Sequence, residues 1–442
     1  MYLVYFPFWG IISMLNTHKS DGVFADMPFR CLRWIWEILY VVIPAIEYSY
    51  PHETSVYLPD DVMINILSRL PAESLLACQK VCKQWRSLTS SPCFIRLFLQ
   101  RVTPVIFMRV NFIRTSHGML ADGHETASFL FDHTTSGTLK IQKLKLKEDL
   151  MLPGDNYPLI LSSCGGFLLF ASPGRYYIVN PLTQEHAGFY RPEPGYLRGF
   201  FYHSSRNEFK ILYALRVGNN YLHEHYIYTL GANNWRKIKA PHLPYSPPPG
   251  KSAPAICNGS LHWIVCQTSD WENDRPCLCN ILVFKMDAEE FFLLPRPWET
   301  SWKKFGYQTM NLFALGDSLA FCNLNCTLGM IEVHILEDYA SGFWVLKWTL
   351  DLRRAERPAV VDHPKLVSVK LLLIHNEELW LDCYERGVYV YHLERNTVRR
   401  LGGPPWSLFA AFGRGIVTHD CVPYVRSHLR LPESMFTQKL PL

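Results

Sequence analysis

The sequence predicts a multidomain α+β chain, in which a small N-terminal unit of three short helices precedes an all-β propeller of five to six blades. Two observations lead to this prediction. Apolar residues recur every three or four positions over residues 58–94, which is helical spacing. From about residue 104 the spacing becomes alternating, and groups of short strands return at intervals of about forty to fifty residues.

Length and composition narrow the class of protein. A chain of 442 residues can form about two or three domains, and its hydrophobic content of 48% excludes global disorder. The 44 Lys and Arg residues are scattered among 39 Asp and Glu residues, so we do not expect nucleic acid as a partner. Thirteen cysteines without a repeated spacing favour buried thiols in a reducing compartment over a disulfide framework.

Residues 1–55 form an apolar leader of uncertain order. Residues 1–18 carry no charged side chain, whereas a secretory signal has basic residues ahead of its apolar core. Residues 31–50 have the length to span a bilayer, but Pro44 and three charges interrupt them. Three interpretations stay open: a poorly ordered or non-native leader, an amphipathic segment packed on the protein or on a membrane surface, and an anchor. We do not expect a membrane partner.

The helical stretch begins at Leu58-Pro59, where two acidic residues suit the start of a first helix. Pro71 ends that helix. The spacing then predicts a second helix that continues to Leu88, and Ser90-Ser91-Pro92 ends it. Helices this short cannot bury all their Leu, Ile, Val and Trp side chains among themselves, so a partner is predicted.

Several motifs of this stretch occur in a recognisable order. They are Leu58-Pro59 with the acidic pair, Ile66-Leu67-Ser68-Arg69-Leu70-Pro71, Ser74-Leu75, Val81-Cys82-Lys83-Gln84-Trp85-Arg86 and Pro92-Cys93-Phe94. Residues 56–100 therefore resemble the F-box, although Gln79 stands where many F-boxes carry a basic residue. The alternative is an ordinary three-helix subdomain packed inside its own chain.

The F-box resemblance implies docking on a Skp1-type adaptor and, through it, membership of a cullin-RING ubiquitin ligase. The adaptor-binding residues that it implies are Leu58, Pro59, Ile66, Leu67, Leu70, Pro71, Leu75, Val81, Cys82 and Trp85.

Five groups of strands are clear in the β region, and a sixth is expected from residues 104–147. The five are residues 158–185, 198–238, 255–296, 311–350 and 366–397. Blades must bury both faces against neighbours, so such copies fit a ring. The closing stretch, 408–417 and 422–429, is too short for a blade, and we expect it to pair with an early strand. A β-sandwich is the rival architecture.

The β region also carries the motifs Ser163-Cys164-Gly165-Gly166-Phe167, Tyr177-Ile178-Val179-Asn180-Pro181, Asn258-Gly259-Ser260-Leu261-His262-Trp263 and Ile331-Glu332-Val333-His334. In these it resembles the F-box-associated, kelch-related domain of plant F-box proteins, although the strict kelch double glycine with separated Tyr and Trp is largely missing. The resemblance implies a kelch-like β-propeller over residues 104–430.

Motifs for catalysis are absent from the sequence. It contains no complete phosphate-binding loop of the form GxxxxGK[ST], no dinucleotide Gly pattern, no GxSxG and no HExxH. His223-Glu224-His225 lacks further metal ligands, and a surface loop is the favoured interpretation. We therefore expect no enzyme activity, no cofactor and no metal.

Together the two resemblances imply the substrate-recognition subunit of an SCF-type E3 ubiquitin ligase, which we expect in the cytoplasm and/or nucleus. An unidentified protein substrate would bind in long polar loops, at 223–226, 241–254, 269–275 and 297–307. The candidate contact residues there are His223, His225, Trp271, Arg275, Trp298 and Trp302. The alternatives are a small-ligand-binding propeller and a scaffold, membrane-tethered or not, without a ligase role.

Overall fold

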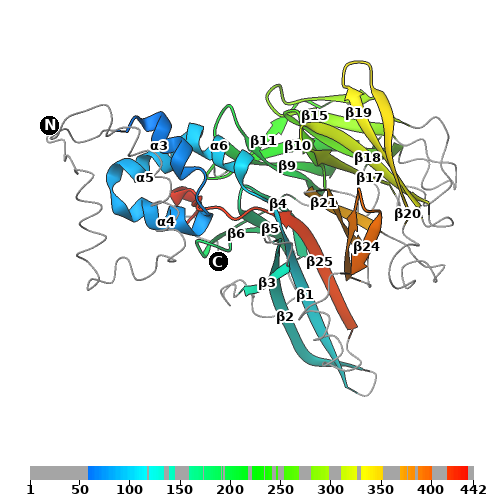
Figure 1. Ribbon diagram of the computed structural model, residues 1–442, viewed down its shortest axis with the longest axis horizontal. Coiled ribbons are helices and arrows are strands. Elements are labelled where there is room, and N and C mark those ends of the chain that lie inside the picture. The colour runs from blue at the N-terminus through cyan, green and yellow to red at the C-terminus, as the bar shows by residue number, and fades with distance from the viewer. Residues whose placement is uncertain are drawn as a thin grey trace. The chain divides into compact units, whose positions relative to one another are not determined.

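The computed structural model describes two separate units of the chain (Figure 1). The described residues are 58–436 without 117–118, 134–138, 145–158, 173, 191, 193–194, 218–221, 233, 241–244, 247–252, 268–279, 298–309, 326–329, 352–368, 376, 384–386 and 401–415. The apolar leader, predicted at 1–55, lies outside them. The first unit comprises the helices together with Arg426–Leu429, and the second comprises the β structure with the remaining C-terminal residues.

The helical unit has four helices. They are α3 (Asp60–Leu67), α4 (Ala72–Val81), α5 (Lys83–Thr89) and α6 (Pro92–Arg101). Pro59 and Pro71 precede the first two, as expected from proline's fixed φ. At α6 the Ser91 hydroxyl accepts a hydrogen bond from the Phe94 N–H, and Pro92 occupies the first turn. No helix in the described ranges combines the length and apolar character needed to cross a membrane.

The prediction of three helices is corrected to four, because the long second helix is interrupted. Cys82 has extended backbone angles, φ −155° and ψ 164°, and so ends α4. Its sulfur accepts a hydrogen bond from the Trp85 N–H at 3.4 Å and thereby begins α5. The apolar spacing continues across this break, which is why periodicity alone predicted one helix. Pro92 both ends the α5 segment and opens α6.

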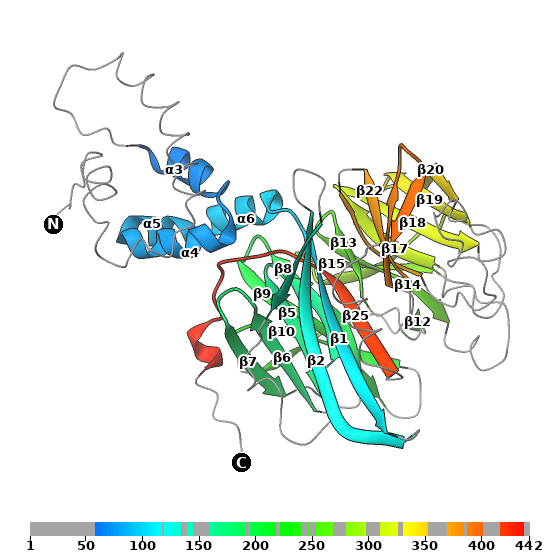
Figure 2. The ribbon, with the colours of Figure 1, turned by 60° about the horizontal axis from the view of Figure 1, so that its bottom comes forward.

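The β unit is a six-bladed propeller, so the predicted architecture is confirmed and the β-sandwich is wrong (Figure 2). Within the described residues the strands form six antiparallel sheets. Blade 1 contains β25 (Ile416–Tyr424), β1 (Val105–Ser116), β2 (Met119–His133) and β3 (Leu139–Leu144), and blade 2 contains β4 (Leu159–Cys164), β5 (Phe167–Ser172), β6 (Arg175–Asn180) and β7 (Glu185–Tyr190).

Blades 3 to 6 follow in chain order. Blade 3 contains β8 (Gly195–His203), β9 (Glu208–Val217), β10 (Leu222–Thr229) and β11 (Trp235–Ile238). Blade 4 contains β12 (Tyr245–Ser246), β13 (Ala255–Cys257), β14 (Ser260–Gln267), β15 (Asn280–Lys285) and β16 (Glu290–Leu294). Blade 5 contains β17 (Met310–Leu315), β18 (Ser318–Asn325), β19 (Met330–Asp338) and β20 (Phe343–Asp351), and blade 6 contains β21 (Val369–His375), β22 (Glu378–Cys383), β23 (Gly387–His392) and β24 (Thr397–Arg400).

The last strand closes the ring. β25 pairs antiparallel with β1, in a register that sets Val105 opposite Tyr424 and Ile113 opposite Ile416, and both ribbon views show the two strands side by side (Figures 1 and 2). The predicted pairing of the closing stretch with an early strand is thereby confirmed for residues 416–424, while residues 408–415 lie outside the described part of the chain.

Alternation along β1 explains how the blades pack. Ile106 and Met108 point to one face and pack with residues of blade 6, such as Trp380. Val105 and Phe107 point to the other face and join a cluster with blade 2. A strand with both faces buried needs apolar residues at successive positions, and VIFM supplies them. The core is therefore a series of apolar layers between blades.

The connections between strands differ at the two edges of the blades. At one edge the hairpins are tight, and non-glycine residues with positive φ recur there: Gln184, Asn207, Asn258, Glu289, Glu377 and Asn396. Because the strands are antiparallel, the other connections, which include residues 218–221, 239–254, 268–279, 295–309 and 352–368, join strand ends at the opposite edge. We call the first the tight-turn edge and the second the long-segment edge.

Two glycines of the tight-turn edge give a matched test of the packing. Gly259 and Gly342 have φ of +64° and +68°, but a Cβ at Gly259 meets nothing, whereas one at Gly342 lies 2.6 Å from Pro295. We expect Gly259→Ala to lower the free energy of unfolding by about 1 kcal/mol and Gly342→Ala by roughly 1–3 kcal/mol more. Urea unfolding of the two variants measures the difference. Equal losses would contradict the contact with Pro295.

Candidate functional site

The most exposed apolar feature of the helical unit lies where α4 meets α5. Val81 is 42% exposed, and Cys82 and Trp85 beside it are half-buried. We call these three residues the junction patch. An exposed Val flanked by an accessible indole is the kind of surface that a partner protein covers.

The ten adaptor-binding residues implied by the sequence divide into three groups. Leu67, Leu70 and Leu75 are buried in the core of the helical unit. Pro59, Pro71 and Val81 are exposed, and Leu58, Ile66, Cys82 and Trp85 are intermediate. The first group therefore holds the helices together, and the other seven residues offer atoms to a partner. Which of the seven touch an adaptor stays a prediction.

Side-chain hydrogen bonds hold the junction patch in place. The Gln84 amide donates to the Asp60 carboxylate at 3.0 Å, which ties the start of α5 to the start of α3. The Gln79 amide donates to the Thr89 hydroxyl at 3.2 Å, and that hydroxyl donates to the Trp85 carbonyl at 2.8 Å. Gln79, the departure from the usual F-box pattern, thus links α4 to the end of α5. A pattern of residue types alone could not reveal this bond.

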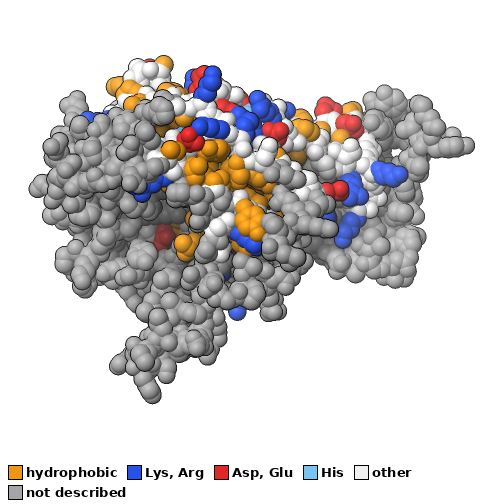
Figure 3. All heavy atoms as spheres, turned by 180° about the vertical axis from the view of Figure 1, so that it is seen from behind, with side chains coloured by type: hydrophobic (Ala, Val, Ile, Leu, Met, Phe, Trp, Pro, Cys, Tyr) orange, Lys and Arg blue, Asp and Glu red, His pale blue; other side chains and the backbone are white. Residues whose placement is uncertain are grey.

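The charges around the junction patch are basic. Lys80, Lys83 and Arg86 are neighbours of its residues in the sequence, and all three are exposed. Over residues 58–103 the chain has six Lys and Arg against three Asp and Glu. On the face of the molecule seen in Figure 3, by contrast, basic and acidic side chains are interspersed. The helical unit is therefore more basic than the balance of the whole chain indicates.

The predicted substrate contacts lie at the long-segment edge or outside the described residues. Trp271, Arg275, Trp298 and Trp302 belong to the latter. His223 and His225 lie in β10, so the interpretation of this stretch as a surface loop is wrong. Alternation places both imidazoles on one face of β10, as the spacing of two residues requires. His225 is only 7% exposed, and its ring packs against Phe291 at 4.6 Å between centroids.

Two further residues, which the sequence did not indicate, lie near these histidines. The Tyr196 hydroxyl lies 3.2 Å from His223 Nε2, and the buried Arg198 guanidinium lies 4.9 Å from the Tyr196 ring centroid. The register sets Tyr196 of β8 and His225 of β10 on opposite sides of Ala214 of β9, so the Tyr196 ring reaches His223 across the middle strand. Only this strand pairing brings them together, so no local sequence signal could have identified Tyr196 or Arg198.

Burial keeps both imidazoles uncharged. Desolvation, followed by the nearby Arg198 charge, lowers the pKa of His223 to about 4 and the pKa of His225 to about 3. Neutral imidazoles can ligate metals, but within the part of the chain that the structure describes no three His, Cys, Asp or Glu side chains gather in a way that could hold a metal ion.

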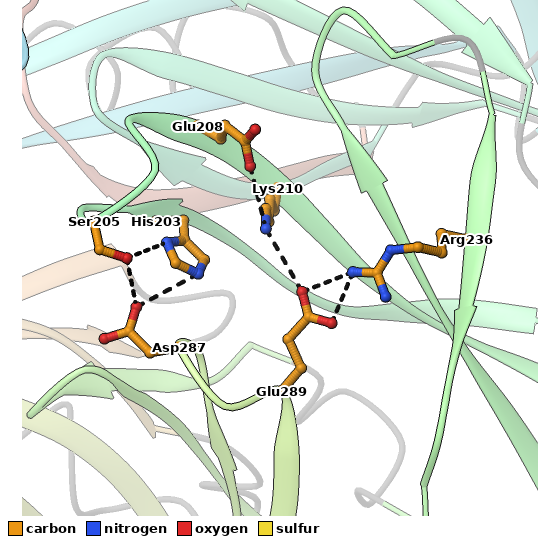
Figure 4. A network of polar contacts seen from close by, with 7 residues as sticks. All are labelled: His203, Ser205, Glu208, Lys210, Arg236, Asp287 and Glu289. Atoms are coloured by element: carbon orange, nitrogen blue, oxygen red, sulfur yellow. Dashed lines mark hydrogen bonds and ion pairs between the residues drawn. The ribbon is translucent and has the colours of Figure 1, made fainter.

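A polar network joins blade 3 to the turn between β15 and β16 (Figure 4). Arg236 Nη2 donates to both carboxylate oxygens of Glu289, each at 2.7 Å, and the buried Lys210 ammonium lies 3.6 Å from the same carboxylate. Burial opposes ionisation of Glu289, but the hydrogen bond and charge of Arg236 outweigh it, so the pKa of Glu289 is lowered. Glu208 approaches Lys210 from the other side at 3.2 Å.

The same network contains a serine, a histidine and an aspartate. The Ser205 hydroxyl donates to Asp287 at 2.9 Å and lies 3.2 Å from His203 Nδ1, while His203 Nε2 lies 3.5 Å from Asp287. In a catalytic triad the serine and the aspartate bind opposite nitrogens of the imidazole, and the aspartate does not bind the serine. Here Asp287 accepts the hydrogen bond of Ser205 itself and lies near His203 Nε2 without a hydrogen bond to it. The arrangement is therefore a clamp between blades rather than a nucleophilic site.

The buried imidazoles make stability depend on pH. The folded pKa of His225, about 3, lies below the unfolded value of about 6.5, so the unfolded chain binds more protons in between. Stability is therefore lost as pH falls below about 6.5. We expect His225→Gln to reduce this slope by about 1 kcal/mol per pH unit between about pH 6 and 4.5. Urea unfolding at several pH values measures it. Above about pH 7.5 the two curves should run parallel, and identical slopes at acidic pH would contradict the assignment.

Comparisons with known proteins agree with this architecture. The family described as F-box associated beta propeller domain matches residues 118–402, and the one described as F-box-like matches residues 56–100. A putative F-box protein from Arabidopsis thaliana is 23% identical over 82% of this chain and 92% of its own length. An F-box protein and an F-box/kelch-repeat protein of that plant are 29% and 23% identical, over 77% and 79% of this chain and 78% and 86% of their own lengths.

Among solved structures, one of a protein of unknown function from Bacteroides caccae aligns with 74% of this chain and all of its own, at 8% identity and a TM-score of 0.36. The F-box-like match covers the four helices up to residue 100, and the propeller match covers blades 2 to 6 together with β2 and β3 of blade 1. The chain thus belongs to the family of F-box proteins that carry an F-box associated β-propeller.

Proposed function

We propose that this chain is the substrate-recognition subunit of an SCF-type E3 ubiquitin ligase. Its helical unit docks on a Skp1-type adaptor, which links it to a cullin-RING ligase, and its propeller binds the protein to be ubiquitinated. The observation that carries the proposal is the junction patch, an exposed apolar surface inside the segment that matches the F-box.

The chemistry of the junction patch indicates the kind of surface it needs. The exposed Val81 and the half-buried Trp85 favour an apolar partner surface, because covering them removes apolar area from water. Lys80, Lys83 and Arg86 around the patch favour acidic residues at the rim of that surface. The adaptor's docking face would therefore be apolar at its centre and acidic at its border.

The propeller supplies the second binding surface. Long connections join strands at one edge of the blades, and binding residues are commonly found on connections that a rigid scaffold positions. His223 of β10 lies next to such a connection, residues 218–221. The chain would act without catalysis of its own, since holding a substrate beside the transfer machinery raises its effective concentration there.

A charge placed in the junction patch tests the adaptor assignment. We expect Val81→Glu to weaken binding of a Skp1-type adaptor by about tenfold or more, because docking would then bury a carboxylate without a partner. Val81 is exposed in the unbound chain, so the helices should stay folded. Titration calorimetry measures the affinity, and circular dichroism checks the fold.

Phe343→Glu is the matched control, since Phe343 is an exposed apolar residue of β20 in the propeller. Its adaptor affinity should equal that of the unmodified chain. Equal affinities for all three proteins would contradict the role of the junction patch, and failure of the unmodified chain to bind any Skp1-type adaptor would contradict the proposed function.

Variants of the long connections test the substrate assignment. We expect proteins captured by the full chain in cells with a blocked proteasome to be lost on changing Trp271 and Trp302 to Ala, while the adaptor is still captured. Quantitative mass spectrometry of the captured proteins measures both. Retention of every captured protein would remove the two tryptophans from the substrate site.

A further inference from the structure

The helical unit contains four residues from the other end of the chain. Arg426–Leu429 belong to it, while the residues before and after them belong to the propeller unit. We call these four residues the C-terminal insert. Ser427, His428 and Leu429 are all buried. Because three of its four residues are buried, the insert is part of a core and is not a linker on the surface.

His428 fills a gap between the aromatic residues of α6. Its ring lies 5.6 Å from the ring of Phe94 and 5.1 Å from the ring of Phe98, edge-on to both at 78°. Both phenylalanines are almost fully buried. Edge-to-face contacts at these distances are favourable beyond the apolar area that they bury.

His428 also satisfies the end of α5. The carbonyl groups in the last turn of a helix lack partners within the helix. The Thr89 carbonyl accepts a hydrogen bond from His428 Nε2 at 3.0 Å, which requires that Nε2 carries the proton. Burial lowers the pKa of His428, although the bond to Thr89 raises it, so the ring is uncharged at neutral pH.

The C-terminal insert touches a third helix through its first residue. Arg426 Nε lies 3.5 Å from the Glu73 carboxylate in the first turn of α4. The insert thus contacts α4, α5 and α6. These helices have ten, seven and ten residues, and helices of such length depend on tertiary contacts for their stability.

The residues on both sides of the insert are held by the propeller. Two residues before it, β25 ends at Tyr424 in its pairing with β1. Directly after it, Arg430 and the Leu431 N–H bind the Glu185 carboxylate of β7, both at 3.0 Å. The stretch that closes the ring therefore continues without interruption into the stretch that completes the helical unit.

We infer that the C-terminal insert is an integral part of the adaptor-docking unit, so that the helices become competent to dock only in a chain whose C-terminal end is present and whose ring is closed. This rests on the proposed function for its docking part. Thr89 of α5 contacts both the insert and the junction patch. Its carbonyl accepts the hydrogen bond from His428, and its hydroxyl donates to the Trp85 carbonyl. A chain that ends before residue 426 would then carry the F-box sequence without a complete F-box fold.

Two variants of the full chain separate the contributions of His428. His428→Ala removes the ring and the N–H donor, and His428→Phe keeps a ring without the donor. Hydrogen exchange of α5 and α6 amides should speed up by about tenfold or more in His428→Ala and by less in His428→Phe. Amides of β14 and β15 should keep their rates. The adaptor affinity of His428→Ala should fall by about threefold or more, because a smaller fraction of the molecules would have the folded helices that bind the adaptor.

Phe436→Ala is the matched control, because Phe436 lies in the same C-terminal stretch, is exposed and stands outside the insert. It should leave both readouts unchanged. Unchanged exchange of α5 and α6 in His428→Ala would overturn the inference, and so would equal acceleration in β14 and β15. Faster exchange with unaltered adaptor affinity would overturn its docking part. If the unmodified chain binds no adaptor, the proposed function fails, and the exchange rates still decide whether the insert completes the helical unit.

Discussion

The pairing of β25 with β1 is the contact on which the rest of this structure depends. Each blade is apolar on both faces, so each face must lie against a neighbour, and only a closed ring supplies a neighbour on both sides of every blade. Closure joins the last strand of the chain to the first. This pairing joins residues about 300 positions apart in the sequence, so forming it costs loop entropy. The fold therefore depends on contacts between residues that are distant in the sequence.

The features that the sequence predicted correctly are those that local patterns determine. Alternating apolar residues and recurring polar turns indicated the blades, and helical spacing indicated the first unit. The break at Cys82 was missed, because apolar periodicity passes through it and only the backbone angles of one residue reveal it. The strand position of His223 and His225 was missed because charged and aromatic residues around them resemble a loop.

The functional surfaces were predictable only in part. The F-box motif locates the segment for which docking is proposed, but burial separates Leu67, Leu70 and Leu75, which form the core, from Val81, which faces outward. Register and closure determine the remaining contacts. Tyr196 meets His223 through strand pairing, and His428 meets Phe94 from the other end of the chain, so neither contact leaves a trace in the nearby sequence.

The difference between the two edges of the propeller has a consequence for how such proteins diverge. At the tight-turn edge, residues with positive φ and close contacts such as Gly342 against Pro295 fix the length of each hairpin. At the long-segment edge, a longer connection adds only a little closure entropy, because that cost grows slowly with the number of residues. Changes in the length of one set of connections are therefore compatible with an unchanged ring, whereas changes in the hairpins of the other set are not.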